Sequence, residues 1–74
     1  MNTIGSKIKK LRLEKDMTQE ELARKADIPY ATLLKIENDT VKNPTINTLQ
    51  KLAQALGVSV DFLINLNSKQ NGKI

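Results

Sequence analysis

The chain has 74 residues, enough for one small domain, and 39% hydrophobic with only 3% aromatic residues favour closely packed helices around an aliphatic core. It contains no cysteine and no histidine, which excludes disulfides, thiol and imidazole catalysis and the usual zinc ligands. The formal net charge is +4, and seven of the twelve basic residues lie in the first 25 positions, a distribution that favours an anionic partner.

Other classes of protein are also disfavoured. No apolar run approaches the roughly 18 residues that a membrane span needs, and the first ten residues lack the apolar region of a signal peptide. We therefore expect a soluble, cytoplasmic protein with no membrane contact. The chain has no glycine-rich phosphate loop and no evident pair of catalytic carboxylates, so it is not expected to be an enzyme or to hold a cofactor, metal or small-molecule ligand.

The first predicted helix spans residues 4–15. Its apolar residues recur with the spacing of one helix face: Ile4, Ile8 and Leu11. Asp16 is expected to end the helix, because Asp tolerates the left-handed conformation that often follows a helix. Residues 1–3 are expected to be a frayed end.

Residues 18–38 predict two short helices joined by a tight turn. Thr18 and Glu21 have the spacing of a capping box, which marks the start of the second helix. Pro29 is expected to open the third helix, since proline is favoured in a first helical turn. The inward residues of the two helices are Leu22, Ala23, Ala26, Ile28, Leu33 and Ile36. Their spacing leaves the third helix with an outward face.

Two more helices are predicted after a loop at residues 38–44. Thr45 caps the fourth helix and Gly57 ends it, while Ser59 caps the fifth. The inward stripe of the fourth helix is Ile46, Leu49, Leu52, Ala53 and Leu56, and the apolar residues of the fifth are Val60, Phe62, Leu63, Ile64 and Leu66. The predicted fold is all-α, a compact five-helix domain over residues 1–66, followed by a polar, disordered tail at residues 67–74.

Five motifs occur in a compatible order: Ile8-x-x-Leu11-Arg12, Met17-Thr18-Gln19-x-Glu21-Leu22-Ala23, Ile36-Glu37-Asn38, Pro44-Thr45 and Ala55-Leu56-Gly57-Val58-Ser59-Val60-Asp61. Over about residues 4–66 the chain thereby resembles the lambda repressor/Cro-type helix-turn-helix domains, also called the xenobiotic-response-element family. The resemblance implies a lambda-repressor-like bundle whose third helix enters the major groove of double-stranded DNA. The start of the second helix would then lie against the phosphate backbone.

The resemblance also implies roles for individual residues. Base readout falls to the positions matching Tyr30, Ala31, Leu34 and Lys35. Phosphate contacts fall to Thr18, Gln19, Thr32, Asn38, Thr40, Lys42 and Asn43. Arg12 and Glu37 are expected to form a semi-buried ion pair between the first helix and the end of the third, where a competing account leaves both on the surface.

Several of these assignments have a structural alternative. Gln19 and Lys42 are also explained as solvated surface residues, and Lys35 as an ordinary surface lysine or a phosphate contact. Leu34 suits a thymine methyl group, yet contact with a loop or a second subunit explains it as well. Tyr30 is explained either by contact with the DNA backbone or by partial burial beside the second helix.

Four residues depart from the common pattern of the family. Asp16, Asp27 and Asp39 stand where glycine is frequent at helix ends and turns, and a left-handed Asp costs roughly 1 kcal/mol. Pro29 replaces the usual capping Ser or Thr of the third helix. The exact register of the third helix after this proline is therefore open.

The first functional hypothesis is a sequence-specific transcriptional regulator, with repression as the expected mode, that is associated with the nucleoid in the cytoplasm. It would act as a homodimer on a two-fold-related operator with half-sites about 34 Å apart. The expected dimer surface is Phe62, Ile64 and Leu66, unless a core this small needs all three inside. The alternative is a protein-interaction module such as an antitoxin, which an outward Leu34 favours, whereas Gln19, Lys35 and the basic charge favour DNA.

Overall fold

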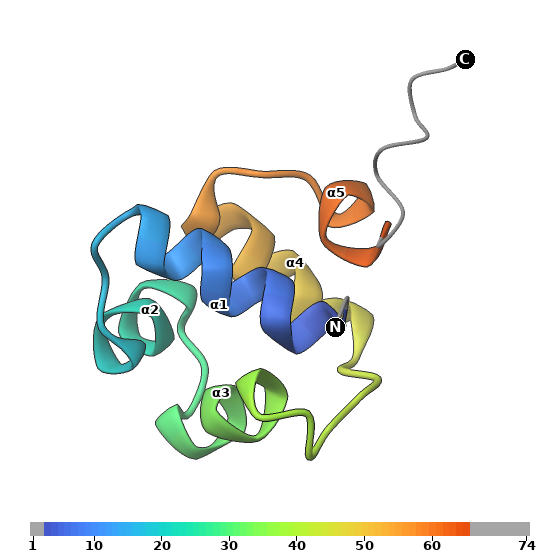
Figure 1. Cartoon of the computed structure of the whole chain (residues 1–74), viewed down its shortest axis with the longest axis horizontal. Coiled ribbons are helices and arrows are strands. Elements are labelled where there is room, and N and C mark those ends of the chain that lie inside the picture. The colour runs from blue at the N-terminus through green and yellow to red at the C-terminus, as the bar shows by residue number, and fades with distance from the viewer. Residues whose placement is uncertain (1–2, 66–74) are drawn as a thin grey trace.

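The computed structural model describes residues 3–65, in which five helices occur and no strand (Figure 1). The helices are α1 (Ile4–Glu14), α2 (Gln19–Ala26), α3 (Tyr30–Glu37), α4 (Ile46–Leu56) and α5 (Val60–Ile64). This confirms the all-α class and the predicted order of the helices. The predicted tail at residues 67–74, and with it the domain boundary, lies outside the described residues and stays a prediction.

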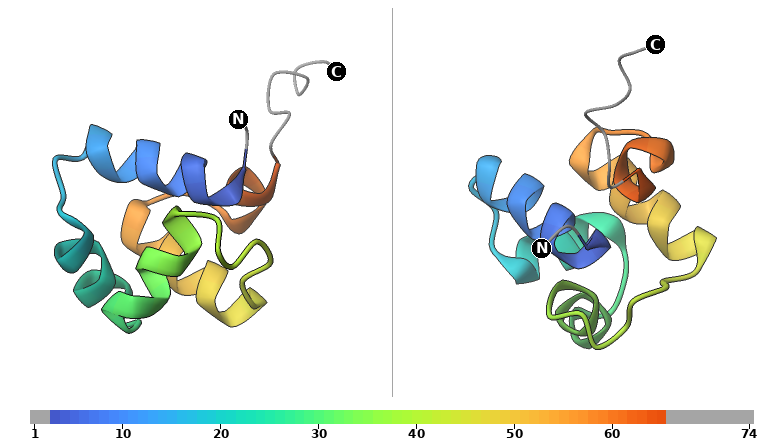
Figure 2. Two further views of the ribbon diagram at one scale, coloured as in Figure 1. Left: turned by 60° about the horizontal axis from the view of Figure 1, so that its bottom comes forward. Right: turned by 45° about the vertical axis from the view of Figure 1, so that its right-hand side comes forward.

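The core is aliphatic, as the scarcity of aromatic residues predicted. Its largest fully buried side chains are Ile8, Leu22, Leu33, Ile36, Leu52, Leu56 and Leu63, so each of the five helices contributes at least one. Ile46 was expected inside, and that prediction is wrong, because its side chain is 60% exposed. It is the first residue of α4, which begins at the edge of the molecule, beyond the helices that cover its later turns (Figure 2).

Side-chain caps begin most of the helices, as local sequence dictates. The predicted caps Thr18, Thr45 and Ser59 each accept a hydrogen bond from a backbone N–H in the first turn of the following helix. Thr3 forms a capping box that the sequence analysis missed: its hydroxyl accepts from the Ser6 N–H at 3.0 Å and its N–H donates to the Ser6 hydroxyl at 3.1 Å. The expectation that residue 3 frays is therefore wrong. The box is not evident in the sequence, because serine takes the place usually held by Glu or Gln.

Left-handed residues end several segments. Asp16, Asp27 and Asp39 have φ values of 55°, 60° and 65°, and Gly57 has a φ of 73°. The three aspartates therefore adopt the conformation that glycine would adopt more easily, as predicted. At Asp27 this conformation turns the chain sharply between α2 and α3.

The close crossing of α1 and α3 depends on Gly5. A Cβ atom on this residue would lie only 2.1 Å from the Ile36 carbonyl oxygen and 2.8 Å from an Asp39 carboxylate oxygen. Only glycine therefore allows the start of α1 to pass this near the end of α3. Nothing in the local sequence around Gly5 indicates this contact.

The short helix α5 is held on α1 and α4 through Leu63, which is fully buried. Lys7 of α1 adds a second attachment: its Nζ donates to the Asn65 carbonyl at 2.8 Å and lies 4.2 Å from the centre of the Phe62 ring. Loss of hydration on burial, together with the charge of Lys10, lowers the pKa of Lys7. None of the helices in residues 3–65 has the length and apolar character to cross a membrane.

Candidate nucleic-acid interface

The turn between α2 and α3 sets the start of the outward helix. Asp27 takes the left-handed conformation and Pro29 is extended, with φ −63° and ψ 142°. Pro29 is therefore the residue before the helix, not the first residue within it as expected. It supplies no side-chain cap, and Tyr30 and Ala31 become the first two residues of α3. This resolves the register that the sequence left open.

The two faces of α3 differ in exposure. Leu33, Ile36 and Glu37 are buried against the rest of the domain. Of the four residues predicted to read bases, Tyr30, Ala31 and Lys35 are exposed, and Tyr30 retains 44% of its accessible surface. Leu34 is only partly exposed, as is Thr32. Three of the four side chains are therefore free to meet a partner on this face, and Leu34 lies at its margin.

The start of α2 is held by a complete capping box. The Thr18 hydroxyl accepts from the Glu21 N–H at 3.0 Å, and the Thr18 N–H donates to Glu21 Oε1 at 2.8 Å. The threonine O–H remains a donor, because only its oxygen takes part in the cap. Thr18 is exposed and Gln19 partly so, which leaves both at the surface beside α3.

Arg12 and Glu37 form the predicted ion pair. Arg12 Nε donates to Glu37 Oε2 at 2.8 Å and Arg12 Nη2 donates to Oε1 at 3.1 Å, with the two side chains only 8% and 3% exposed. Arg12 Nη1 also donates to the Met17 carbonyl at 2.7 Å. The pair therefore ties α1 to the end of α3 and to the residue before the α2 cap.

Gln19 belongs to the same network through a contact that was not predicted from the sequence. Its Nε2 donates to Glu37 Oε1 at 2.9 Å. The residues are 18 positions apart, so neither helical spacing nor a local motif could reveal the contact. Gln19 was predicted as a phosphate contact, and the second hydrogen of its amide group is compatible with that role.

Side-chain and backbone hydrogen bonds stabilise the loop after α3. Asn38 Oδ1 accepts from the Thr40 N–H at 3.0 Å and from the Thr40 hydroxyl at 2.6 Å. The Val41 N–H donates to the Lys35 carbonyl at 3.0 Å, and Val41 is partly buried. Asn38, Thr40, Lys42 and Asn43, predicted as phosphate contacts, are all exposed along this loop. Figure 1 shows the loop continuing from the end of α3.

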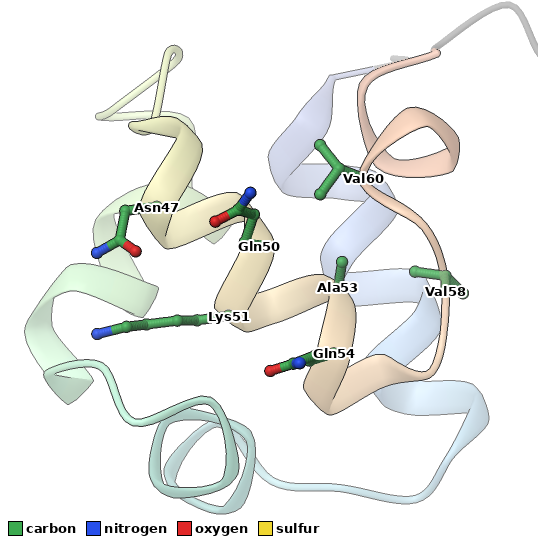
Figure 3. Close-up of a pocket in the computed structure, with 7 residues that line it drawn as sticks. All are labelled: Asn47, Gln50, Lys51, Ala53, Gln54, Val58 and Val60. Atoms are coloured by element: carbon green, nitrogen blue, oxygen red, sulfur yellow. The ribbon is translucent and has the colours of Figure 1, made fainter.

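A hollow of about 450 Å³ lies elsewhere, over α4 and the start of α5 (Figure 3). It is lined by Asn47, Gln50, Lys51, Ala53, Gln54, Val58 and Val60. Lys51 extends from it toward the turn between α2 and α3, where its Nζ lies 3.5 Å from the Asp27 carbonyl oxygen. The hollow contains none of the residues predicted to contact DNA. In the part of the chain that is described, no three acidic side chains gather where a metal ion could bind.

Known proteins share both the sequence and this arrangement. Residues 8–63 match the family model described as Helix-turn-helix. The immunity repressor protein of Bacillus phage phi105 is 40% identical over 62 residues, which cover 84% of this chain and 42% of that protein. The transcriptional regulator SinR of Bacillus licheniformis is 42% identical over 62 residues, which cover 84% of this chain and 56% of that regulator. The chain thus spans about half the length of these relatives.

A solved structure agrees with the fold. The crystal structure of SinR, described there as the master regulator for biofilm formation and solved in complex with DNA, matches with a TM-score of 0.80 at 41% identity. The match covers 82% of this chain and 97% of that one. The family match includes the whole α2, turn and α3 unit and the Arg12–Glu37 pair. This chain therefore belongs to the helix-turn-helix family of the Cro/repressor type.

Proposed function

We propose that this chain binds double-stranded DNA in a sequence-specific manner and regulates transcription, with repression as the expected mode. The observation that carries the proposal is the exposed face of α3 beside the capped start of α2, in a domain that matches the DNA-bound SinR structure. The major groove of B-form DNA is wide enough to admit one α-helix, and α3 presents Tyr30, Ala31 and Lys35 on an exposed face. The family is one of DNA-binding regulators and not of enzymes.

Base readout is assigned to the outward residues of α3. The Lys35 ammonium group is suited to donate to O6 and N7 of guanine, and the apolar edge of Leu34 to meet a thymine methyl group. Tyr30 would pack on the sugar backbone or donate its hydroxyl to a phosphate. The small Ala31 would let the helix approach the bases closely.

Phosphate contacts are assigned to both ends of the α2–α3 unit. At the start of α2, the free N–H groups, the Thr18 hydroxyl and the Gln19 amide group are donors beside the positive end of the helix dipole. Thr32 in the first turn of α3 is a further contact, and the residues after the end of α3 complete the set: Asn38, Thr40, Lys42 and Asn43. Asn38 uses its oxygen for Thr40, so its NH₂ group is the part available to a phosphate.

The assembly is proposed to be a homodimer on a two-fold-related operator with half-sites about 34 Å apart. Phe62 and Ile64 support this, because they remain 41% and 44% exposed on α5. Leu66, the third expected interface residue, lies outside the described residues. In the view of Figure 1, α3 and α5 lie on different sides of α1 and away from each other, so a partner on α5 would leave α3 open to DNA. Such a protein would work on the nucleoid in the cytoplasm.

The alternative function, a protein-interaction module such as an antitoxin, drew its support from an outward Leu34. That support is reduced, since Leu34 is partly buried in the isolated domain. The remaining exposed surface of α3 carries a lysine and a tyrosine. These residues do not form the large apolar patch that marks a protein-binding face. DNA is therefore the preferred partner.

Selection from a pool of random duplexes, followed by affinity measurements over a range of salt concentrations, tests the proposal. We expect a two-fold-symmetric sequence to be enriched and log affinity to fall linearly with log salt, because phosphate contacts release counterions. Absence of any enriched sequence at low salt would contradict the proposal.

Two substitutions separate readout from positioning. Lys35→Ala should relax the preference at one base pair by about 1–3 kcal/mol, whereas Gln19→Ala should weaken binding to all sequences alike. Binding of each variant to the selected operator and to single-base variants of it gives the comparison. Lys10→Ala is the matched control for lost charge, because Lys10 is an exposed lysine of α1 and is not among the residues proposed to contact DNA. A uniform loss of affinity on Lys35→Ala would refute its role in base readout.

A further inference from the structure

The amide group of Gln19 is oriented by a carboxylate. Glu37 Oε1 accepts a hydrogen bond from Gln19 Nε2 at 2.9 Å. An ionised carboxylate only accepts hydrogen bonds, so it selects the nitrogen side of the amide and turns Gln19 Oε1 away. An unanchored glutamine can present either its acceptor oxygen or its donor NH₂ group to its surroundings. The contact with Glu37 removes that ambiguity.

Glu37 is itself held firmly enough to serve as an anchor. Both of its oxygens accept from Arg12, at 2.8 Å and 3.1 Å, and its side chain is only 3% exposed. A bidentate pair between arginine and a carboxylate adds geometric specificity as well as energy, because two parallel hydrogen bonds fix the relative orientation of the groups. Arg12 also donates to the Met17 carbonyl at 2.7 Å, two residues before Gln19. The network therefore holds the start of α2 at its backbone and at a side chain.

The charges in this network are balanced. A lone carboxylate near the start of α2 would repel a phosphate, but Arg12 neutralises Glu37 inside the domain. Only one of the two Gln19 Nε2 hydrogens is used by Glu37, and the other remains available at the partly exposed surface. The side chain is thus a donor with a fixed direction, formed before any ligand arrives. Such preorganisation reduces the entropy lost on binding.

We propose that Glu37 is a positioning residue for DNA binding, which holds the Gln19 amide so that its second Nε2 hydrogen faces a backbone phosphate. This inference rests on the proposed DNA-binding function and adds a role for a residue that does not touch DNA. Arg12 acts one step further back, because it fixes the carboxylate of Glu37. The helix α3, which is proposed to read bases, and the phosphate contact of Gln19 are thereby linked through the buried Arg12–Glu37 pair.

A double-mutant cycle on DNA affinity tests the proposal. The network is removed by the paired replacement Arg12→Met with Glu37→Leu, since exchanging a buried ion pair for apolar residues of similar volume is often neutral for stability. In the native background we expect the Kd for the selected operator to rise about ten-fold. In a Gln19→Ala background the same replacement should change the Kd less than about two-fold, because no amide remains to be positioned.

The possible outcomes separate this inference from the proposed function. Equal losses of affinity in both backgrounds would overturn the positioning role while leaving DNA binding intact. A native chain that binds no selected duplex would overturn both. Thermal unfolding is the control for structure, and it is measured on the native chain, the paired replacement, the Gln19→Ala variant and the variant that combines them. A merely structural role predicts that loss of stability and loss of affinity run in parallel.

A second measurement uses the native chain and does not depend on the folding of any variant. The two Nε2 hydrogens of Gln19 give separate NMR signals, because rotation about the bond between the amide carbon and nitrogen is slow. On addition of the selected operator we expect one signal to shift strongly and the other, from the hydrogen donated to Glu37, to change little. Two unchanged signals, or two signals that shift equally, would contradict the positioning role.

Discussion

Gly5 and Arg12 bring α1 against the last turn of α3 by different means. Gly5 does so through the absence of a side chain, since a Cβ atom would meet the Ile36 carbonyl at 2.1 Å. Arg12 does so through a buried bidentate pair with Glu37. Because Glu37 also holds Gln19, the orientation of a proposed phosphate contact depends on two residues of α1 that would never touch DNA.

The substitution Gly5→Ala should destabilise the domain by about 1–3 kcal/mol, the usual cost of overpacking. Alanine favours a helix over glycine by up to about 1 kcal/mol, but the new Cβ would meet backbone atoms that cannot move aside without separating α1 from α3. The free energy of unfolding in urea measures the effect. Lys9→Ala, an exposed change in the same helix, should stay within about 0.5 kcal/mol. Unchanged stability of the Gly5 variant would mean that the two helices are not packed this closely.

At the scale of single elements, α2 and α3 begin in opposite ways. α2 starts at a complete capping box between Thr18 and Glu21, whereas α3 starts after Pro29 with no side-chain cap. The proline still defines the start, because its fixed φ and missing N–H suit the edge of a helix. The start of α3 is therefore set by the packing of neighbouring helices and by the left-handed Asp27, and less by a capping residue of its own.

Removal of the α2 cap should lower the free energy of unfolding of the whole domain. Thr18→Ala is expected to cost about 1 kcal/mol, since it leaves a backbone N–H in the first turn without its partner. Chemical unfolding followed by circular dichroism gives the difference. Glu20→Ala is the matched control, because Glu20 is exposed in the same turn and takes no part in the box. Equal effects of the two substitutions would show that the cap contributes nothing specific.

At the scale of the whole molecule, the proposed DNA face and the proposed dimer face are separate. α3 lies on one side of α1 and α5 on the other (Figure 1). The helix α5 has only five residues, too few to be stable alone, so it depends on buried Leu63 and on the contacts of Lys7. Its outer residues Phe62 and Ile64 are then presented on a surface that the core has already fixed.

Ile64→Ser should weaken assembly without changing how one domain reads DNA. We expect the affinity for a complete two-fold operator to fall about ten-fold, as apolar burial between copies is lost, while the affinity for a single half-site stays the same. Gel-shift titrations on the two duplexes measure both values. Leu13→Ser is the control, because Leu13 is a 54% exposed residue on α1. If both substitutions weakened operator binding alike, α5 would not be the dimer surface.

How far the sequence predicts this protein depends on the distance over which each feature is decided. The helix order was predicted from hydrophobic periodicity. Two kinds of local feature were also predicted, because each involves residues within one turn of a helix: the caps at Thr18, Thr45 and Ser59, and the left-handed aspartates. The Arg12–Glu37 pair was predicted from the resemblance to the family, and the position of Glu37 directly after the inward Ile36 favoured it. The cap at Thr3 was missed because Ser6 is an unusual partner in a capping box.

Only the tertiary structure decided which side chains meet across the domain. The contact of Gln19 with Glu37, the crossing at Gly5, the partial burial of Leu34 and the exposure of Ile46 were not predictable from spacing along the chain. Each depends on where another helix passes, and hydrophobic periodicity specifies which face of a helix turns inward but not what that face meets. The sequence by itself thus determined the helices, their ends and the family, whereas the packing of α1 against α3 determined how the proposed DNA-contacting residues are held.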